Sequence, residues 1–400
     1  MSGRVPRRYS PGSNSAHAAH KPRAFAANAL DGGVIAAFSI LAGIGLVMIY
    51  SLTAPLAAAN AMPPQFIRQL ITLATSILVL IAALRVPLAV WRRLALPLWG
   101  VSSVLLLATL VVGVEVNGAR RWLELPGLRL QAAEVAKFAT VLAVAVLLTA
   151  SPSRRARLKP VVRAVALCVP PVALLLLQPD FGSSLVLCAV VGALLFAAGT
   201  RMRLLVPPIV LAVGGATVYV ARNPYAQARL IGFLDPWATA TREGFQLVQS
   251  FVAFARGGPF GVGLGGGRQK LHYLPEVHTD FILAGIAEEL GLLGVLAVLG
   301  AFAAFVWAGV RIAQRAREPF AALVAIGMTS LIGIPAAINA AVVMGLLPTT
   351  GFTLPFVSYG GNSLLICSLA VGILLRVGAC EAAPIQPRIS DASRRRISRT

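Results

Sequence analysis

The sequence has little charge, few acidic residues and few cysteines. Charged residues make up 12% of the 400-residue chain, and only 14 of them are acidic against 35 lysines and arginines. Soluble domains carry about 25% charged residues, so this composition excludes an ordinary soluble globular protein. The four cysteines, Cys168, Cys188, Cys367 and Cys380, have no CxxC spacing. That pattern argues against a disulfide framework and favours buried thiols that pack as small apolar side chains.

Apolar residues are abundant instead. They form 58% of the chain, and the mean hydropathy is +0.81. A membrane-spanning helix needs about 20 predominantly apolar residues, and this measure predicts an all-α polytopic membrane protein with about ten transmembrane helices. The tripeptide Gln178-Pro179-Asp180 separates the fifth and sixth of them as a tight hairpin. The expected spans are residues 33–55, 66–86, 94–114, 132–150, 161–177, 181–199, 204–221, 281–309, 320–346 and 361–378.

The lysines and arginines predict the orientation in the membrane. Most of them lie in residues 1–30, in the even-numbered loops and in residues 381–400. Cytoplasmic flanks collect cations, so we expect both termini in the cytoplasm as basic, disordered tails near anionic lipid. No cleaved signal peptide is expected. Cations spread over short loops and tails also argue against a nucleic-acid partner.

The same orientation places a large loop, residues 221–280, outside the cytoplasm between spans seven and eight. The membrane domain therefore covers residues 31–380. Most acidic residues lie toward the outer face, and loops of this length are usually functional. We therefore expect the working site on the extracytoplasmic side of the cytoplasmic membrane.

Several polar groups could build that site. Arg120 precedes the fourth span, and Glu134 and Lys137 are three residues apart on one face of that helix, so they can pair. Ionisable residues inside a span are costly and are candidates for function. A self-neutralised ion pair beside an interfacial tryptophan remains the alternative. Asp180 is explained by capping of the sixth span, or it shapes the site from behind.

The large loop adds Gln246, Gln249 and Ser250, followed by a glycine-rich run at residues 257–267. The run lacks the GK[ST] ending of a nucleotide P-loop. Its backbone N–H groups could approach an anion such as pyrophosphate. Thr349 and Ser358 lie between the last two spans in a segment rich in proline and glycine. Such backbone at membrane depth is tolerated where it lines a cavity, so this segment is expected to wall the same site.

The most concentrated polar stretch runs from Arg268 to Gly291. Asp280 stands where the loop enters the eighth span, as a helix cap or as a reactive carboxylate. Glu288 and Glu289 follow within the span. Adjacent helical positions point about 100° apart, so these acids require different partners. At least one of them should face a polar cavity or a cation such as Lys137.

The stretch also contains Glu276 and His278. A metal site built from Glu276, His278 and Asp280 is conceivable, although no recognised ligand signature is present. No GxSxG motif supports nucleophilic hydrolysis.

Four motifs together resemble the SEDS family (shape, elongation, division and sporulation). They are Gln178-Pro-Asp-Phe-Gly182, Arg268-Gln-Lys-Leu-x-Tyr-Leu-Pro-Glu-x-His-Thr-Asp-Phe-Ile282, Glu288-Glu-Leu-Gly291, and Leu347-Pro-Thr-x-Gly-x-Thr-Leu-Pro-Phe-x-Ser-Tyr-Gly-Gly361. The resemblance covers about residues 30–380 and is nearer to the cell-division (FtsW-like) type than to the elongation (RodA-like) type. Two departures are Ala132 in place of a common proline and Thr350 in place of a frequent lysine.

The resemblance implies a peptidoglycan glycosyltransferase that polymerises lipid II with a class B penicillin-binding transpeptidase, among other division proteins at the septum. It also implies that Asp280 is the essential residue. We therefore predict that Asp280 is the general base. Arg268 and Lys270, with Lys137 or a divalent cation (Mg²⁺ or Mn²⁺), are predicted to hold the pyrophosphate. A lipid II flippase, a scaffold that recruits the transpeptidase and an elongation-type polymerase remain alternatives. The predicted substrate-binding set is Arg120, Glu134, Lys137, Gln246, Gln249, Ser250, Arg268, Lys270, Glu276, His278, Thr349 and Ser358, with Asp180, Glu288 and Glu289 in structural roles.

Overall fold

The computed structural model describes residues 30–56, 62–116, 119–125, 128–150, 158–275 and 277–382. The predicted basic tails, most of the cations of the fourth loop, and Glu276 lie outside these residues. All ten predicted spans are present as helices. They are α1 (Gly32–Thr53), α2 (Pro64–Arg85), α3 (Leu88–Val112), α4 (Ala132–Thr149), α5 (Leu158–Leu177), α6 (Phe181–Ala197), α7 (Met202–Arg222), α10 (Ile282–Arg315), α11 (Pro319–Val343) and α12 (Gly361–Ala382).

The helices have the length and composition of membrane spans. Among the described residues, nine are long and apolar enough to cross a membrane. The remaining one of the ten, α6, is a shorter apolar helix of 17 residues. At 1.5 Å per residue it is about 25 Å long, near the lower limit for a span. The prediction of a polytopic helical membrane protein is therefore confirmed.

Two helix starts show how local sequence fixes the span boundaries. Asp180 is the N-cap of α6, and its carboxylate accepts a hydrogen bond of 3.0 Å from the Ser183 amide. Asp31 caps α1 in the same way through the amides of Gly33 and Val34. Both carboxylates satisfy N–H groups that the first turn of a helix leaves unpaired.

The segment between α3 and α4 is a small antiparallel sheet that the sequence analysis did not predict. Its strands, in the order β1-β2-β3, are β1 (Val114–Val116), β2 (Ala119–Leu125) and β3 (Leu128–Gln131). Oppositely charged side chains face each other across it, Glu115 opposite Arg120 and Glu124 opposite Arg129. Such cross-strand pairs stabilise a short sheet.

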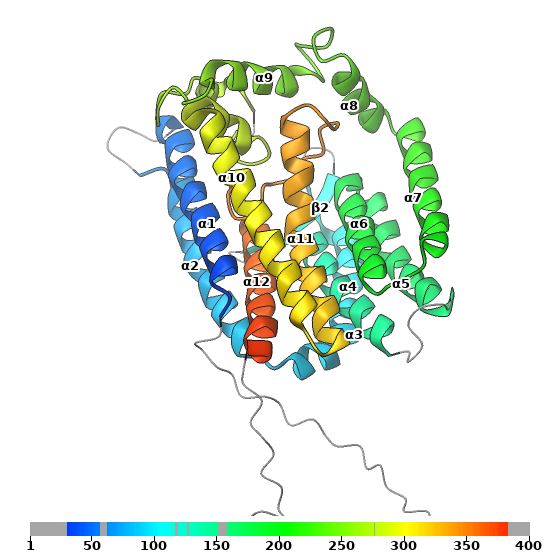
Figure 1. Cartoon of the computed structure of the whole chain (residues 1–400). Coiled ribbons are helices and arrows are strands. Elements are labelled where there is room, and N and C mark those ends of the chain that lie inside the picture. Colours follow the sequence, from blue (N-terminus) through cyan, green and yellow to red (C-terminus); the bar gives the residue numbers. More distant parts are fainter. Residues whose placement is uncertain are drawn as a thin grey trace, which may run out of the picture.

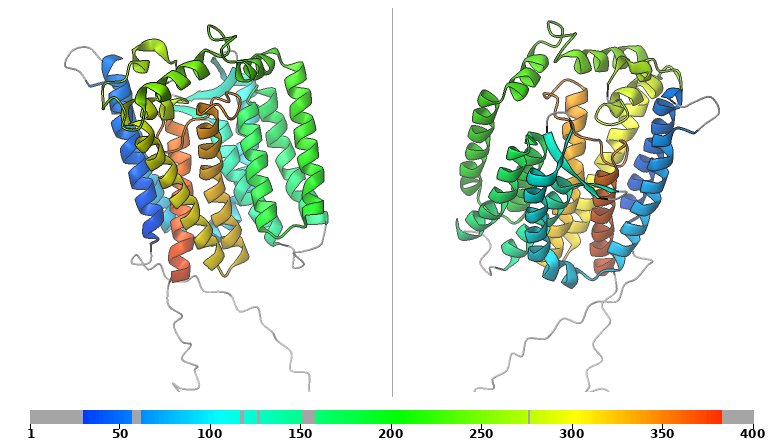
Figure 2. Two further views of the ribbon diagram at one scale, coloured as in Figure 1. Left: turned by 45° about the horizontal axis from the view of Figure 1, so that its top comes forward. Right: turned by 180° about the vertical axis from the view of Figure 1, so that it is seen from behind.

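The central helices of the bundle are α4, α11 and α12. In the most apolar stretch of α4, 72% of the residues are buried inside the protein. In the corresponding stretch of α7, only 6% are buried. Figure 1 shows α7 standing at one side of the bundle, and both views in Figure 2 agree. Small residues let the central helices approach closely, because a Cβ atom on Gly327 would lie 2.4 Å from Val141 of α4.

The large segment between α7 and α10 contains helices that were expected only as a loop. They are α8 (Pro224–Leu234), α9 (Phe245–Gly257) and one π-helical turn, η3 (Gln269–Tyr273). The remaining short element is a 3-10 turn after α1, η2 (Ala54–Leu56). In Figure 1, α8 and α9 lie across one end of the bundle. The start of α1 and the end of α12 lie at the opposite end. We refer to the α8–α9 end as the loop end of the bundle.

Candidate active site

Asp280 lies in a turn directly before α10. The N-cap of that helix is Phe281, and no side-chain hydrogen bond closes it. Asp280 is therefore not the N-cap residue of α10. Its backbone carbonyl accepts a hydrogen bond of 2.7 Å from Asn339 Nδ2 in α11. The carboxylate stands in a segment whose backbone is held by another part of the chain.

Residues 344–360, between α11 and α12, also lie beside Asp280. Gly351 in this segment has φ of +74°, and a Cβ atom there would lie 3.4 Å from Asp280 Oδ2 and 3.9 Å from Arg229 Nη1. Arg229 belongs to α8 and also donates to the Thr349 carbonyl at 2.8 Å. The carboxylate and one guanidinium therefore approach the same point of backbone from two elements.

The hairpin between α5 and α6 meets the same segment. Gly182 at the start of α6 lies against Phe352, because a Cβ atom there would be 2.8 Å from the Phe352 ring. Arg121 of β2 donates to the carbonyls of Gln178 and Pro179. The motifs that contain Asp180, Asp280 and Gly351 are far apart in the sequence, and they lie together at this place.

Glu134 and Lys137 form the predicted ion pair, with 2.8 Å between Nζ and Oε1. Their side chains are 13% and 4% exposed, so both charges lie inside the bundle. Arg120 behaves differently, because its half-exposed side chain pairs with Glu115 on the sheet.

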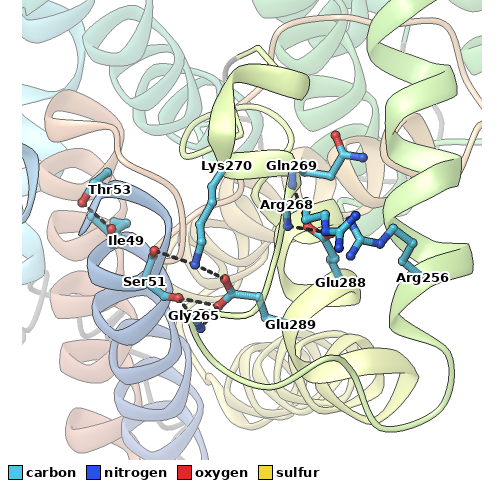
Figure 3. A network of polar contacts seen from close by, with 10 residues as sticks. All are labelled: Ile49, Ser51, Thr53, Arg256, Gly265, Arg268, Gln269, Lys270, Glu288 and Glu289. Atoms are coloured by element: carbon cyan, nitrogen blue, oxygen red, sulfur yellow. Dashed lines mark hydrogen bonds and ion pairs between the residues drawn. The ribbon is translucent and has the colours of Figure 1, made fainter. Parts of the chain in front are cut away.

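Glu288 and Glu289 have separate partners, as their adjacent helical positions require. Glu288 forms an ion pair of 3.1 Å with Arg256 of α9. Glu289 pairs with Lys270 at 2.8 Å and accepts a hydrogen bond from the Ser51 hydroxyl of α1. Figure 3 shows this network joining α1, the large loop and α10. Lys137 takes no part in it, since its carboxylate partner is Glu134.

The glycine-rich run packs against these two acids. The Gly265 amide donates to Glu289 Oε2 at 3.1 Å, and the amides of Arg268 and Gln269 donate to Glu288 at 2.9 and 3.1 Å. A Cβ atom on Gly267 would lie 2.9 Å from Glu288 Oε2. The run does bring backbone N–H groups close to anions, but those anions are carboxylates of the same chain.

The other predicted residues differ in burial and in their hydrogen-bond partners. Lys270 is buried and paired, whereas the Arg268 side chain is exposed. The Ser250 hydroxyl donates a hydrogen bond to the Val343 carbonyl, and the Ser358 hydroxyl donates to the Thr279 carbonyl. Gln246, Gln249, His278 and Thr349 are partly buried around the same end of the bundle, and the ring centroid of His278 lies 5.8 Å from that of Tyr359.

Sequence reasoning missed Arg229, Arg256, Asn339 and Ser51 as candidate site residues. Asn339 carried a signal, because it is a lone amide in an apolar span. The two arginines carried none beyond their position in the large loop. Among the described residues, no three His, Cys, Asp or Glu side chains are grouped to hold a metal ion. Because Glu276 lies outside them, the predicted trio of Glu276, His278 and Asp280 stays untested.

These features define a multi-span helical membrane protein with a polar site at one end of its bundle. The chain matches the model of the "Cell cycle protein" family, FtsW/RodA/SpoVE, over residues 33–382. The protein belongs to this family.

Relatives and solved structures agree. A probable peptidoglycan glycosyltransferase FtsW of Alkalilimnicola ehrlichii is 45% identical, covering 87% of this chain and 89% of its own. The Coxiella burnetii relative of the same description is 42% identical, covering 86% and 94%.

Among solved structures, one described as a peptidoglycan synthase complex that coordinates polymerization and crosslinking contains a similar chain. That chain is 31% identical with a TM-score of 0.75, and the match covers 88% of this chain and 98% of that one. RodA of Thermus thermophilus, a rod shape determining protein, is 29% identical with a TM-score of 0.66, covering 88% and 97%.

Proposed function

We propose that this protein, a SEDS-family peptidoglycan glycosyltransferase of the FtsW type, polymerises lipid II with Asp280 as its general base. The substrate is then an undecaprenyl-pyrophosphoryl disaccharide-pentapeptide. The observation that carries the proposal is that the Asp280 carboxylate and the Arg229 guanidinium both lie within 4 Å of the Cβ position of Gly351. A base and a cation near the same point of the backbone suit a reaction that takes a proton from one group and leaves an anion on another.

The reaction joins two lipid-linked glycans. A sugar hydroxyl of the acceptor attacks the anomeric carbon of the donor, and the bond from that carbon to the lipid pyrophosphate breaks. Asp280 accepts the hydroxyl proton, and the electron pair of the broken bond leaves with the pyrophosphate. Pyrophosphate is already a good leaving group, so it needs stabilisation of charge more than it needs a proton donor.

Cations near Asp280 are proposed to stabilise the departing pyrophosphate. Arg229 is a candidate by geometry, since it approaches Gly351 as Asp280 does, and the exposed Arg268 stays in this role as the sequence predicts. Lys270 is better explained as a structural partner of Glu289, because both side chains are buried and 2.8 Å apart. Lys137 is similarly occupied by Glu134, so it would act on the substrate only through that pair. A divalent cation would enter bound to the pyrophosphate itself.

A partner and a location follow from the same proposal. The solved complex that coordinates polymerization and crosslinking supports a crosslinking partner for this chain, which we propose is a class B penicillin-binding transpeptidase. The FtsW description of the relatives supports action in septal wall synthesis with other division proteins. We place the active site on the extracytoplasmic side, because the loop end carries most of the acidic residues and the cytoplasmic flanks carry the cations.

The test is polymerisation of lipid II by the purified protein in lipid nanodiscs, with and without the cognate transpeptidase. Asp280→Asn keeps the shape of the side chain and removes the base, so glycan strands should become undetectable while lipid II still binds. Normal strand synthesis by this variant would reject Asp280 as the base. Transport of labelled lipid II across liposomes without polymer would favour a flippase instead. Rescue of elongation rather than division in cells would favour the RodA-like alternative.

A further inference from the structure

Three successive carbonyl groups that end at Asp280 are each held by a donor from another part of the chain. All three donors come from α11 or from the segment that connects α11 to α12. The bonds run from the Tyr359 amide to His278 O at 2.9 Å, from Ser358 Oγ to Thr279 O at 2.5 Å, and from Asn339 Nδ2 to Asp280 O at 2.7 Å.

The three donors to these carbonyls do not belong to α10. The first carbonyl that accepts a helical hydrogen bond in α10 is that of Phe281, from the amides of Ala284 and Gly285. Buried backbone carbonyls are almost always paired. The residues before Phe281 therefore take their position from the donors that satisfy them, and those donors determine where the Asp280 side chain starts.

Asn339 is the donor to the backbone carbonyl of Asp280 itself. Its side chain is 2% exposed, and Nδ2 donates both to Asp280 O and to Phe352 O, the latter at 2.5 Å. Because both acceptors are carbonyls, the amide cannot be turned over without setting oxygen against oxygen. Its Oδ1 atom is buried with no partner among the described residues. An unpaired buried acceptor is unfavourable, so the benefit of an asparagine here lies in its two donated bonds.

Ser358 makes the second connection. It is 3% exposed, it accepts from the Leu354 amide at 2.8 Å, and it donates its one hydrogen to Thr279 O. A serine hydroxyl has a single hydrogen to donate, so Ser358 has none left for a sugar or a phosphate. Its contacts lead to the backbone beside Asp280 and not to a ligand, which changes the substrate-binding role that the sequence predicts.

We propose that Asn339 and Ser358 are positioning residues for Asp280: they fix the backbone of residues 279 and 280, and thereby the direction from which the carboxylate meets the acceptor hydroxyl. This assignment rests on the proposed function of Asp280 as the base. A catalytic group must be held within about 0.5 Å of its productive position. Loss of either donor frees the backbone without removing the carboxylate, so the rate of the chemical step falls and substrate binding persists.

The experiment measures kcat, KM and lipid II binding for the full chain in nanodiscs, using fluorescent lipid II. Asn339→Leu keeps the approximate volume and suits an apolar helix, but it lacks the donor. We expect kcat to fall on the order of 10- to 100-fold, as a misplacement of about 1 Å does. KM and lipid II binding should stay within about threefold of the wild type. Ile338→Leu, at the half-buried neighbouring position of α11, is the matched control and should keep the wild-type rate.

A second pair of variants separates positioning from folding. Ser358→Ala removes the hydroxyl and Ser358→Thr retains it, so the threonine variant should recover most of the rate that the alanine variant loses. Equal rates for these two variants, or a normal kcat for folded Asn339→Leu, would overturn the assignment. If Asn339→Leu does not fold, the Ser358 pair still decides. The proposed function is tested separately. Strand synthesis by Asp280→Asn would reject Asp280 as the base, whatever the result for the Asn339 and Ser358 variants.

Discussion

The residue with the largest influence on the site for its size is Gly351. Its φ of +74° lies in the left-handed region, which glycine adopts at no steric cost. A Cβ atom at this position would be in ordinary van der Waals contact with Asp280 Oδ2 and Arg229 Nη1. Glycine is therefore required here by the backbone conformation of the turn, because any other residue would be strained at this positive φ.

Arg229→Gln tests the cation of the site. The amide retains hydrogen-bonding atoms but has no charge, so pyrophosphate loses a charge-assisted hydrogen bond worth roughly 1.5–3 kcal/mol. We expect the KM for lipid II to rise about tenfold or more, with Arg229→Lys intermediate because a lysine lacks the planar fork.

The matched control is Arg222→Gln at the exposed end of α7. It removes the same charge from the same end of the bundle without touching the site. Steady-state kinetics that gave equal KM values for the two glutamine variants would remove Arg229 from the anion-binding role.

Sequence alone could predict the residues whose role depends on local spacing. Glu134 and Lys137 pair because they are three residues apart on one helix, and Asp180 caps the helix it precedes. Arg229 and Asn339 were not predictable as partners of the Asp280 segment, because the large loop and the segment after α11 bring them there. Nothing in the residues around Arg229 encodes its contact with Thr349.

At the scale of elements, the pair of Lys270 and Glu289 joins the large loop to α10, and Ser51 adds α1 to the same connection. Both charged side chains are almost completely buried. Removing one partner of a buried ion pair leaves an uncompensated charge and costs about 3–5 kcal/mol. Thermal unfolding in detergent should therefore show strong destabilisation for Lys270→Met and for Glu289→Gln. The double variant Lys270→Met/Glu289→Gln should be more stable than Lys270→Met.

The exposed pair of Arg92 and Glu318 provides the control for this prediction. Its side chains are 45% and 51% exposed and 3.0 Å apart. An exposed pair contributes about 0–1 kcal/mol, so Glu318→Gln should unfold near the wild-type temperature. Equal melting temperatures for Glu289→Gln and Glu318→Gln would contradict the structural role of the buried pair.

The ten spans were predictable because hydropathy over about 20 residues is a strong signal, and each observed helix overlaps its predicted range. The sheet between α3 and α4 was not predicted. Its strands have three to seven residues, too few for their alternation of apolar and polar residues to stand out. Trp122, for which an interfacial anchor was one of the interpretations, lies within β2. The helices α8 and α9 were missed because they lie in a segment identified by its length and not by its periodicity.

For the whole molecule, the direction in which the bundle crosses the membrane is a prediction from the distribution of lysine and arginine. Cysteine labelling of intact cells tests it. With the native cysteines replaced by serine, Leu264→Cys at the loop end should react with a membrane-impermeant maleimide. Glu318→Cys at the opposite end should react only after lysis. Both positions are exposed, so the reverse result would mean that the bundle has the opposite orientation.

The position of α7 affects how strongly the fold constrains the identity of its residues. In the bundle, α7 lies against α5, α6 and α8 and leaves most of its circumference to the surrounding lipid. A side chain with no neighbour to fit is constrained by its solubility in hydrocarbon and not by its shape. Composition therefore matters more than residue identity along α7, whereas α4 specifies its neighbours residue by residue. Sequence drift is expected to concentrate in α7, even though the two helices are similarly apolar.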